Sequence, residues 1–533
     1  MPSVIKLPCQ HRAWGWSLGA GLVQTLLLAL PGFSAERIYA NYGPVERYIS
    51  VEALETYAET GELTEELEGY SRYLSDEQLE QIRTALLVSA DLDVVTVAQF
   101  LYTPQGEAIL EALGEIVQTA GRQNGALAIR GALILAAANP DGGLNLINVL
   151  KEFPTQGIRV DLRRASLIAR RVLDQIRQTQ RVTAQITQQA TSPNSRYSPA
   201  LLNSLAAAGP YEWTILEFNQ PMLFTNLYLP EGVENAALAV LSHGVGGNRT
   251  TLAYLAEHLA SHGFAVAVVE HPGSSEAQLT ALFSGRARQA IEPEELVQRP
   301  QAIQDLLDAL DSDPLLRRRI DVDQVGVLGQ SFGAYTSLAL AGATVNWESL
   351  KNSCPPEVAQ LNLSLLLQCS ALTLPQPQPR LSDRRVRAAI AINPLGSAIF
   401  GQTGFANIGV PTMLVSGSAD TVTPALAEQI RPFTWLDAAQ KYLVLLQGGT
   451  HFSTIYDPET EIIAVPQAAI GPAPELAERY VRVLSLAFFQ TYLANQPDYQ
   501  SVLSPDYAEF LSQEALPLTL VRELDPEQLQ LRR

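Results

Sequence analysis

The chain has little cysteine and little histidine for its length, since its 533 residues include three cysteines and six histidines. It has no CxxC pair and no cluster of the two residue types, which argues against a structural zinc site. Positive charge is also scarce, because 36 Lys and Arg stand against 55 Asp and Glu, for a formal net charge of −19. An acidic surface repels phosphate backbones, so we expect no nucleic-acid partner.

The first 35 residues have the composition of a leader. Lys6 and Arg12 are their only charged side chains, and an apolar core and then small residues follow. This order predicts a secretory signal peptide that is cleaved near Ser34 or Ala35. The alternative is an uncleaved anchor, because residues 13–33 are long enough to span a bilayer. Both interpretations predict export, to the periplasm or outside the cell, and the anchor would keep the protein next to a membrane.

The composition is that of a globular protein, with 47% hydrophobic and 17% charged residues, and the length suggests two or more domains. Residues 36–190 carry mainly helical signals. Ser75 followed by Gln78 is a capping-box pattern at a helix start, and Gly61 ends another helical stretch. We therefore expect an all-α domain over residues 36–190 and a linker over residues 191–209, where turn-forming residues gather.

The pattern changes after Pro210, where apolar strands begin to alternate with amphipathic helices. Such alternation is typical of an α/β fold, in which helices cover both faces of a mostly parallel sheet. We expect this catalytic domain to span residues 210–500, with residues 501–533 as a C-terminal tail. Active sites in such sheets lie at the carboxyl ends of the strands.

Ser331 lies at such a strand end, within the sequence VGVLGQSFGAYTSLALAG. A GxSxG pattern between an apolar strand and a helix predicts a nucleophile elbow, a strained turn that presents the serine above the sheet. The alternative is an ordinary small residue in a tight turn. A serine hydroxyl becomes a good nucleophile only when a base takes its proton, so the elbow requires a histidine elsewhere in the chain.

Only His451 follows the candidate serine, and the order in this type of fold is serine, acid, histidine. His451 lies in a glycine-rich loop after an apolar strand. Asp420 also follows an apolar strand and is the candidate acid that orients the imidazole. Other acids are less well placed, because Asp383 precedes a strand and Glu428 and Asp437 lie on or beyond the next helix.

A tetrahedral intermediate needs backbone N–H donors for its oxyanion. We expect one donor from Phe332, next to the nucleophile, and one from Val245 in the loop that also holds Gly244 and Gly246. The glycines allow the backbone to approach a substrate closely. His243 begins this loop, and we expect it to support the loop rather than to exchange protons.

The remaining histidines have weaker claims to a role. His271 ends a strand near the site, and we expect it to line the substrate pocket together with the loop at His243. His258 and His262 are four residues apart on a predicted helix, a spacing that suits a metal. Because no third ligand is in view, we interpret them as helix-surface residues and predict no metal site.

The segment LSHGVGGNRTTLAYLAEHLASHGFAVAVVEHPGSS, together with GVLGQSFGAYTS, resembles the α/β-hydrolase group of secreted platelet-activating-factor acetylhydrolases and dienelactone-hydrolase-like esterases. In the acetylhydrolases the acid follows the strand before the one that precedes Asp420. Here Asn393 stands at that place, so the assignment of Asp420 rests on the general hydrolase pattern. The N-terminal part is similar to a helical domain of unknown role that precedes hydrolase domains in phototrophic bacteria.

An insertion over residues 343–385 separates the elbow helix from the next strand, and its apolar content suits either a lid over an acyl chain or ordinary packing. Cys9 lies in the leader, so only Cys354 and Cys369 remain, both in this insertion. In an exported protein such a pair predicts a disulfide, which would brace a lid. The alternative is two buried free thiols.

These observations predict an exported serine esterase that acts on a small-molecule or lipid ester and requires no cofactor. Ser331 would attack the carbonyl, His451 would act as base and then acid, and Asp420 would orient the imidazole. One alternative is a lipase, phospholipase or thioesterase with the same triad. Another, from a different class, is a non-catalytic binding or scaffold protein. The sequence leaves the oligomeric state open.

Overall fold

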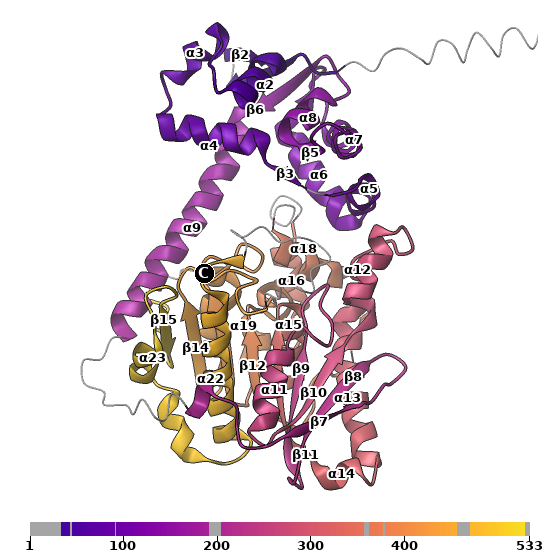
Figure 1. The fold of residues 1–533 in the computed structure, drawn as a ribbon, viewed down its shortest axis with the longest axis vertical. Helices are drawn as coiled ribbons and strands as arrows, with labels where there is room; N and C mark the ends of the chain where they lie inside the picture. Colours follow the sequence, from indigo (N-terminus) through magenta and orange to yellow (C-terminus); the bar gives the residue numbers. More distant parts are fainter. Residues whose placement is uncertain are drawn as a thin grey trace, which may run out of the picture. The chain divides into compact units, whose positions relative to one another are not determined.

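The computed structural model describes residues 34–527 apart from residues 43–44, 91, 191–203, 356–361, 377–378 and 456–469. The leader and most of the expected linker therefore lie outside the described residues. Within the described part, no helix is long and apolar enough to cross a membrane. The chain divides into two compact units (Figure 1), one with the described residues up to Ala90 and Val117–Asp161, the other with Asp91–Ile116 and Leu162 onward.

The first unit is not all-helical, which corrects the expectation for residues 36–190. It contains a four-stranded sheet in the order β2-β1-β6-β4 and a two-stranded sheet of β3 and β5. Its strands are β1 (Arg37–Tyr42), β2 (Val45–Ser50), β3 (Ser89–Ala90), β4 (Val117–Thr119), β5 (Leu144–Asn145) and β6 (Gly157–Asp161). Its helices are α2 (Val51–Thr60), α3 (Glu65–Ser71), α4 (Asp76–Leu87), α7 (Ala126–Ala137) and α8 (Leu146–Lys151).

Local sequence patterns do not reveal this sheet. Its strands are short, and its two central strands, β1 and β6, are far apart in the sequence. β1 pairs in parallel with β6, so that Arg37 lies opposite Gly157. The antiparallel pair of β1 and β2 places Tyr39 opposite Tyr48, with ring centroids 6.2 Å apart. Arg159 of β6 lies over the Tyr39 ring, 5.0 Å from its centroid. Such cross-strand contacts stabilise a sheet but leave no periodicity in the local sequence.

The two helix-terminus signals in this unit are confirmed. Ser75 accepts a hydrogen bond from the Gln78 N–H, and the Gln78 side chain accepts one from the Ser75 N–H, which completes the capping box of α4. Gly61 ends α2 in the left-handed conformation, with φ of 75°. Both signals are local, so they could be recognised from the sequence alone.

The second unit contains a nine-stranded sheet in the order β15-β14-β13-β12-β11-β9-β10-β8-β7. Neighbours from β10 to β14 are parallel, while β7, β8 and β15 run antiparallel to their neighbours. The expected mostly parallel sheet is therefore confirmed. Its strands are β7 (Trp213–Glu217), β8 (Phe224–Pro230), β9 (Ala236–Ser242), β10 (Ala265–Glu270), β11 (Ile320–Gln330), β12 (Val386–Ile392), β13 (Thr412–Gly417), β14 (Lys441–Leu446) and β15 (Leu518–Val521).

Helices cover both faces of this sheet. The helices of the unit are α5 (Val94–Leu101), α6 (Pro104–Ile116), α9 (Leu162–Ala190), α11 (Ala253–Ser261), α12 (Glu276–Phe283), α13 (Glu295–Ser312), α14 (Leu316–Arg319), α15 (Phe332–Ala341), α16 (Trp347–Ser353), α18 (Leu363–Cys369), α19 (Ser397–Ala406), α20 (Arg431–Phe433), α22 (Pro474–Tyr492) and α23 (Pro505–Leu511), with short 3-10 turns η1 (Pro272–Ser274), η2 (Ser370–Thr373) and η4 (Pro497–Val502) and a π-helix η3 (Leu426–Ile430). Among them, α13, α15 and α19 pack on one face and α11 and α22 on the other. Residues 501–533, expected to be a tail, contribute α23 and the edge strand β15.

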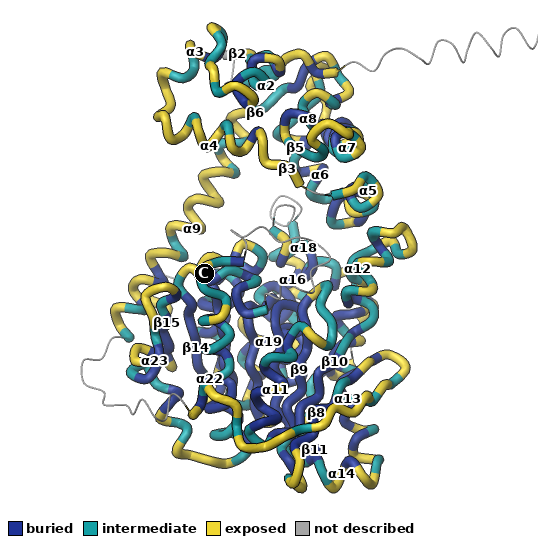
Figure 2. The backbone as a smooth tube through the Cα atoms, viewed as in Figure 1, coloured by how far each residue is buried: buried dark blue, intermediate teal, exposed yellow. Residues whose placement is uncertain are grey.

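The residues of the central strands are buried, as the dark blue parts of the tube in Figure 2 show. In β9, Leu238 and Val240 belong to the same hydrophobic cluster as α13, α15 and α19. Ala239 and Leu241 point the other way and join the cluster of α11 and α22. This two-sided burial explains why these strands are continuously apolar in sequence.

The strand register brings several strand ends to one edge of the sheet. Gly329 of β11 lies opposite Ser242 of β9, and Gln330 lies opposite Ile392 of β12. Ser331, which follows Gln330, is therefore at the carboxyl edge, where parallel sheets place their sites.

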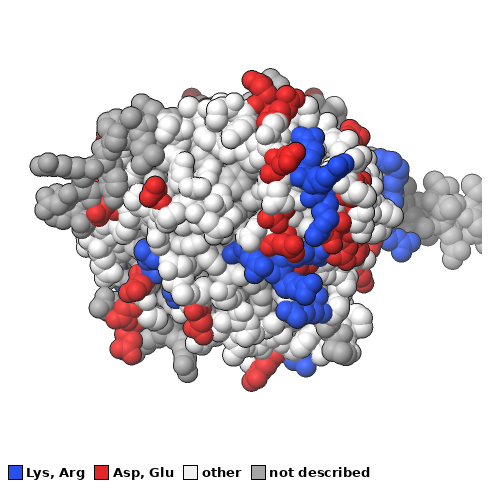
Figure 3. All heavy atoms as spheres, turned by 90° about the horizontal axis from the view of Figure 1, so that it is seen from below, with Lys and Arg blue, Asp and Glu red and all other residues white. Residues whose placement is uncertain are grey.

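The opposite, amino edge carries charged side chains of both signs. Arg385, directly before β12, pairs with Asp308 at 2.7 Å and with Asp383 at 2.6 Å. Figure 3, seen from below, shows basic and acidic side chains next to each other on this part of the surface. Arg385 is therefore paired with two acidic side chains at this edge.

We expect Phe489→Ala to lower the free energy of unfolding of the second unit by about 3–5 kcal/mol. Phe489 of α22 is fully buried against β11, where a Cβ on Gly326 would lie 2.7 Å from its ring. The matched control is Phe510→Ala, because Phe510 is 38% exposed. Urea unfolding measures both, and equal losses in the two variants would contradict the prediction.

Candidate active site

Ser331 occupies a strained turn between the end of β11 and the start of α15. Its φ of 56° and ψ of −116° are sparsely populated for a residue with a side chain. The Ser331 N–H donates to the Ile392 carbonyl at 2.8 Å, and its carbonyl accepts from the N–H groups of Ala334 and Tyr335. Such strain persists only where the surroundings determine the backbone, and here β12 and the first turn of α15 do so.

The glycines around Ser331 are required by close backbone approach. A Cβ on Gly333 would collide with the Ser242 carbonyl, and one on Gly329 would collide with the Gly333 carbonyl. A Cβ on Gly244 would lie 3.2 Å from the Ser331 Cβ. The loop that follows β9 therefore runs directly beside the candidate nucleophile.

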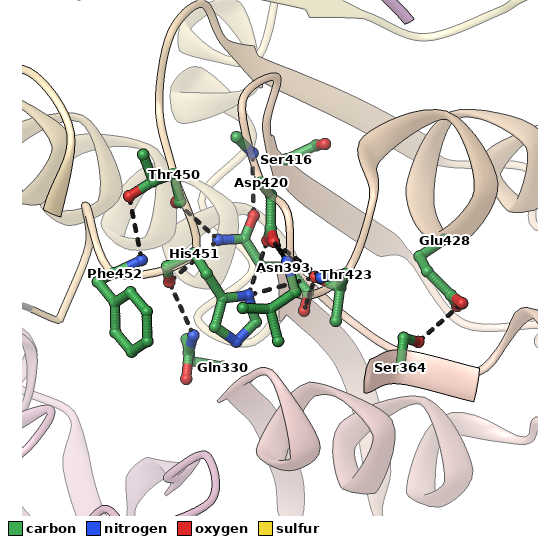
Figure 4. A network of polar contacts seen from close by, with 12 residues as sticks. Gln330, Ser364, Asn393, Ser416, Asp420, Thr423, Glu428, Thr450, His451 and Phe452 are labelled. Atoms are coloured by element: carbon green, nitrogen blue, oxygen red, sulfur yellow. Dashed lines mark hydrogen bonds and ion pairs between the residues drawn. The ribbon is translucent and has the colours of Figure 1, made fainter. Parts of the chain in front are cut away.

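His451 and Asp420 meet at the same edge. The His451 Nδ1 lies 2.7 Å from the Asp420 Oδ2, and each residue is 5% exposed. Figure 4 shows the two side chains facing each other, with His451 delivered after β14 and Asp420 after β13. The Gln330 side chain donates to the His451 carbonyl at 3.1 Å, which ties the histidine loop to the residue before the serine. Among the described residues, no hydrogen bond joins the Ser331 hydroxyl to His451.

The Asp420 carboxylate is held by the turn that follows it. Its Oδ1 accepts the N–H groups of Val422 at 2.8 Å and Thr423 at 2.7 Å. The Thr423 hydroxyl lies 2.8 Å from Asp420 Oδ2 and 3.3 Å from His451 Nδ1. These contacts leave Oδ2 directed at the imidazole, as an orienting carboxylate requires.

Asn393 stands where the resembling acetylhydrolases carry their acid, and it makes structural contacts instead. Its Oδ1 accepts the Gly417 N–H at 2.9 Å, and its Nδ2 donates to the carbonyls of Thr450 at 3.2 Å and His451 at 3.4 Å. Its φ is 46°, a left-handed value that asparagine tolerates better than most residues. Figure 4 shows Asn393 between Asp420 and the loop of His451.

The two candidate oxyanion donors have free backbone N–H groups. Within the described part of the chain, no residue accepts a hydrogen bond from the N–H of Val245 or of Phe332. The next N–H, that of Gly246, is already used, because it donates to the Ser274 carbonyl at 2.9 Å. Gly246 has φ of 76°, which suits a glycine in this turn.

His243 and His271 are buried beneath the loop, at 1% and 2% exposure, so the expectation that His271 lines the pocket is corrected. The His271 N–H donates to His243 Nε2 at 3.0 Å, so the proton of the His243 ring is on Nδ1, which lies 2.5 Å from the Gly244 carbonyl. Burial lowers the pKa of His243 to about 3, and Arg299 adds to this effect. The His271 Nε2 bonds the Ser242 hydroxyl at 3.0 Å. Both neutral rings therefore support the loop.

His258 is buried, at 6% exposure, which corrects its interpretation as a helix-surface residue. Its ring lies 4.9 Å from that of His262, measured between centroids. Within the described residues, no group of three or more His, Cys, Asp or Glu side chains is arranged to hold a metal ion.

The predicted disulfide between Cys354 and Cys369 is confirmed. It joins the residue after α16 to the last residue of α18, so it connects two helices of the insertion. Glu428, which is 1% exposed, accepts hydrogen bonds from Ser364 at 2.8 Å and Gln368 at 2.9 Å on α18. Its other oxygen accepts N–H groups at the start of α19. The described part of the insertion is therefore anchored to the helices that follow β12 and β13.

Sequence reasoning missed the contact roles of Gln330, Asn393, Thr423 and Arg299. Only Thr423 has a local signal, because a threonine three residues after an aspartate is typical of a turn closed by side-chain hydrogen bonds. The other three act on segments far away in sequence. Their contacts depend on strand order and register, which no local pattern encodes.

Comparisons with known proteins agree with an α/β-hydrolase fold. Residues 34–161 match the family described as an alpha/beta hydrolase of unknown function (DUF1400), and residues 214–307 match platelet-activating factor acetylhydrolase, isoform II. Cutinase 2 of Thermobifida cellulosilytica is 22% identical over 287 residues, 52% of this chain and 77% of that protein. Cutinase 1 of the same organism is 21% identical over 56% of this chain and 86% of its own length. Cutinase cut1 of Thermobifida fusca is 22% identical over 52% and 63%, respectively.

We expect Gly333→Ala to lower the free energy of unfolding of the second unit by at least about 2 kcal/mol, because its Cβ meets backbone that cannot move aside. Gly409→Ala is the control, since a Cβ there meets no atom within 4 Å. Thermal unfolding of both variants gives the comparison. A Gly333→Ala protein as stable as the control would show that the elbow is looser than described.

Acid is expected to destabilise the fold partly through His258, whose pKa burial lowers to about 3, helped by His262 and Arg482. The unfolded chain, with the ordinary pKa near 6.5, binds this proton first, so stability is full above about pH 6.5 and is lost as the pH falls toward 3. In His258→Leu, the slope of unfolding free energy against pH, taken below about pH 6 by urea titration, should decrease by up to about 1.4 kcal/mol per pH unit. Parallel curves for the two proteins would argue against a buried neutral His258.

Proposed function

We propose that this chain, which has an α/β-hydrolase fold, is an exported serine hydrolase that cleaves carboxylic esters through Ser331, His451 and Asp420. One observation carries the proposal: the buried 2.7 Å contact between His451 and Asp420 lies at the sheet edge where Ser331 is held in its strained turn. A base oriented by a carboxylate next to an elbow serine is the arrangement that activates a hydroxyl nucleophile.

In the acylation half-reaction, the Ser331 Oγ attacks the ester carbonyl carbon while His451 Nε2 takes the hydroxyl proton. Asp420 holds the Nδ1 proton and stabilises the imidazolium. The carbonyl oxygen becomes an oxyanion and accepts hydrogen bonds from the N–H groups of Val245 and Phe332. When the tetrahedral intermediate collapses, the alkoxide leaves with the proton from His451, and the acyl group remains on Ser331.

The deacylation half-reaction repeats these steps with water. His451 takes a proton from a water molecule, whose oxygen attacks the acyl carbon. The same two N–H groups bind the second oxyanion. Collapse releases the carboxylic acid and returns the proton to Ser331, so the enzyme ends as it began and consumes one water per ester.

Carboxylic esters are the favoured substrate class because the cutinases and the acetylhydrolase family that this chain resembles are ester hydrolases. A lipase, phospholipase or thioesterase would use the same groups, and a panel of esters and thioesters of graded acyl length separates these activities. The apolar, anchored insertion at α16 and α18 is the segment that we expect to set acyl length.

Export is supported by the leader sequence and by the Cys354–Cys369 disulfide, since disulfides persist mainly in oxidising compartments. N-terminal sequencing of the mature protein distinguishes a cleaved signal peptide from an anchor. A binding or scaffold protein on a hydrolase fold is the rival from another class. It would not need Ser331 or His451, and their retention with Asp420 favours catalysis.

We expect a fluorophosphonate probe to label the exported protein at Ser331, and Ser331→Ala to abolish the label. The reason is that the probe reacts with a serine only when a base activates it. Peptide mass spectrometry locates the label. If the wild-type protein stays unlabelled and hydrolyses no ester in the panel, the enzyme proposal is wrong and the scaffold alternative gains support.

Asp420→Asn should lower kcat by about 10³- to 10⁴-fold, because an amide cannot hold the required imidazole tautomer. The matched control is Asp437→Asn, a substitution of the same kind at an exposed site. Hydrolysis of a short-chain chromogenic ester measures both. Comparable activity of the two variants would remove Asp420 from the triad.

A further inference from the structure

Arg299 of α13 is fully buried directly behind the loop that follows β9, with no exposed surface. Its Nη1 donates to the His243 carbonyl at 2.7 Å, and its Nη2 donates to the Gly244 carbonyl at 3.4 Å. Arginine is rarely buried so completely without a functional or structural demand. Here the guanidinium binds two consecutive backbone carbonyls of the loop.

Two contacts on the Gly244 carbonyl, from the Arg299 Nη2 at 3.4 Å and from the His243 Nδ1 at 2.5 Å, set the direction of the Val245 N–H. A trans peptide is planar, so the carbonyl of Gly244 and the N–H of Val245 belong to one plane and point in opposite directions. Arg299 acts on this carbonyl directly and also holds the His243 carbonyl at 2.7 Å, so the Gly244 carbonyl faces Arg299 and the Val245 N–H points away from it. This is the N–H that we assign to the oxyanion.

The same guanidinium also contacts the residue that supplies the other donor. Its central carbon lies 4.3 Å from the centroid of the Phe332 ring, within cation–π distance. Phe332 is fully buried and begins α15 directly after Ser331. Arg299 therefore contacts both segments that carry the free N–H groups, one through a carbonyl and one through a ring.

The buried charge is balanced behind the loop. The Glu295 carboxylate lies 3.4 Å from the Arg299 Nε, and the Ser274 hydroxyl accepts from Nε at 2.9 Å and from Nη2 at 2.7 Å. Burial lowers the pKa of Arg299 to about 10, so the group stays protonated at neutral pH. Because every nitrogen of the guanidinium already has a partner, Arg299 does not contact a substrate.

We propose that Arg299 is a positioning residue that sets the two N–H groups of the oxyanion hole relative to each other, with Glu295 and Ser274 holding it in place. This rests on the proposed function for its catalytic consequence, but the positioning itself is a property of the fold. Ser274 adds a second link, because its carbonyl accepts the Gly246 N–H at 2.9 Å and so fixes the far end of the same loop.

The experiment compares Arg299→Met, Arg299→Lys and the control Arg385→Met, which removes a mostly buried ion-paired arginine at the amino edge of the same sheet. We expect Arg299→Met to lower kcat for a short-chain ester about 10- to 100-fold, because small displacements of oxyanion donors act on the transition state. KM should change by less than about twofold. Arg299→Lys keeps the positive charge and one donor nitrogen, so its kcat should lie between that of Arg299→Met and that of Arg385→Met.

Amide hydrogen exchange followed by mass spectrometry gives a readout that does not depend on activity. In Arg299→Met, we expect faster exchange than in Arg385→Met in the peptides that cover residues 243–247 and 331–335. If the wild-type protein hydrolyses no ester and takes no label, the proposed function fails, and the exchange comparison still decides whether Arg299 positions the loop. Should Arg299→Met not fold, Arg299→Lys is compared with Arg385→Lys.

The proposal is overturned if Arg299→Met matches Arg385→Met in kcat and in the exchange of both peptides. It is also overturned if kcat falls only in proportion to a loss of folded protein, as measured by urea unfolding, because a purely structural role would have that effect. A loss of kcat at unchanged KM in fully folded protein, partly restored by lysine, supports it.

Discussion

One uncharged side chain, that of Asn393, connects the ends of three neighbouring strands. Its carbonyl oxygen accepts an N–H from the end of β13, and its amide nitrogen donates to two carbonyls in the loop after β14, while its own backbone continues β12. An amide can accept and donate at the same time, whereas a carboxylate can only accept. An ionised acid at this position would lose both bonds to the histidine loop. Because Asn393 makes these contacts at the end of β12, the acid of the site must follow another strand, as Asp420 follows β13.

Each buried charge around the site has a partner. Arg299 is the buried cation behind the oxyanion loop, and Glu295 accompanies it. Asp420 lies on the other side, beneath His451, with both oxygens bonded. Buried charges are tolerated only when they are paired or hydrogen-bonded, and each of these is. Because the pKa values of His243 and His271 are lowered by burial, these rings add no further positive charge near Arg299.

The sequence alone predicts the features that depend on a short motif or on the number of residues of one type. The elbow around Ser331 is a short motif at a strand–helix junction, and a single histidine follows it, so His451 was the only candidate for a base in that chain order. The sheet of the first unit was missed because its defining pair joins β1 to β6, which are distant in sequence. Arg299 was missed because nothing in an amphipathic helix distinguishes an arginine that points inward. Its role appears only when α13 is placed behind the loop after β9.

The order of the strands along the chain has a consequence for when the candidate site can assemble. Ser331, Asp420 and His451 occur in the order in which a ribosome makes them, and β15, which pairs with β14 beside the histidine loop, comes after all three. A nascent chain that ends after β11 lacks the Ile392 carbonyl that holds the Ser331 N–H, and one that ends after β13 lacks the base. Only a nascent chain that extends past His451 therefore contains all three residues. The candidate site therefore cannot assemble before β14 and the loop that carries His451 have been made.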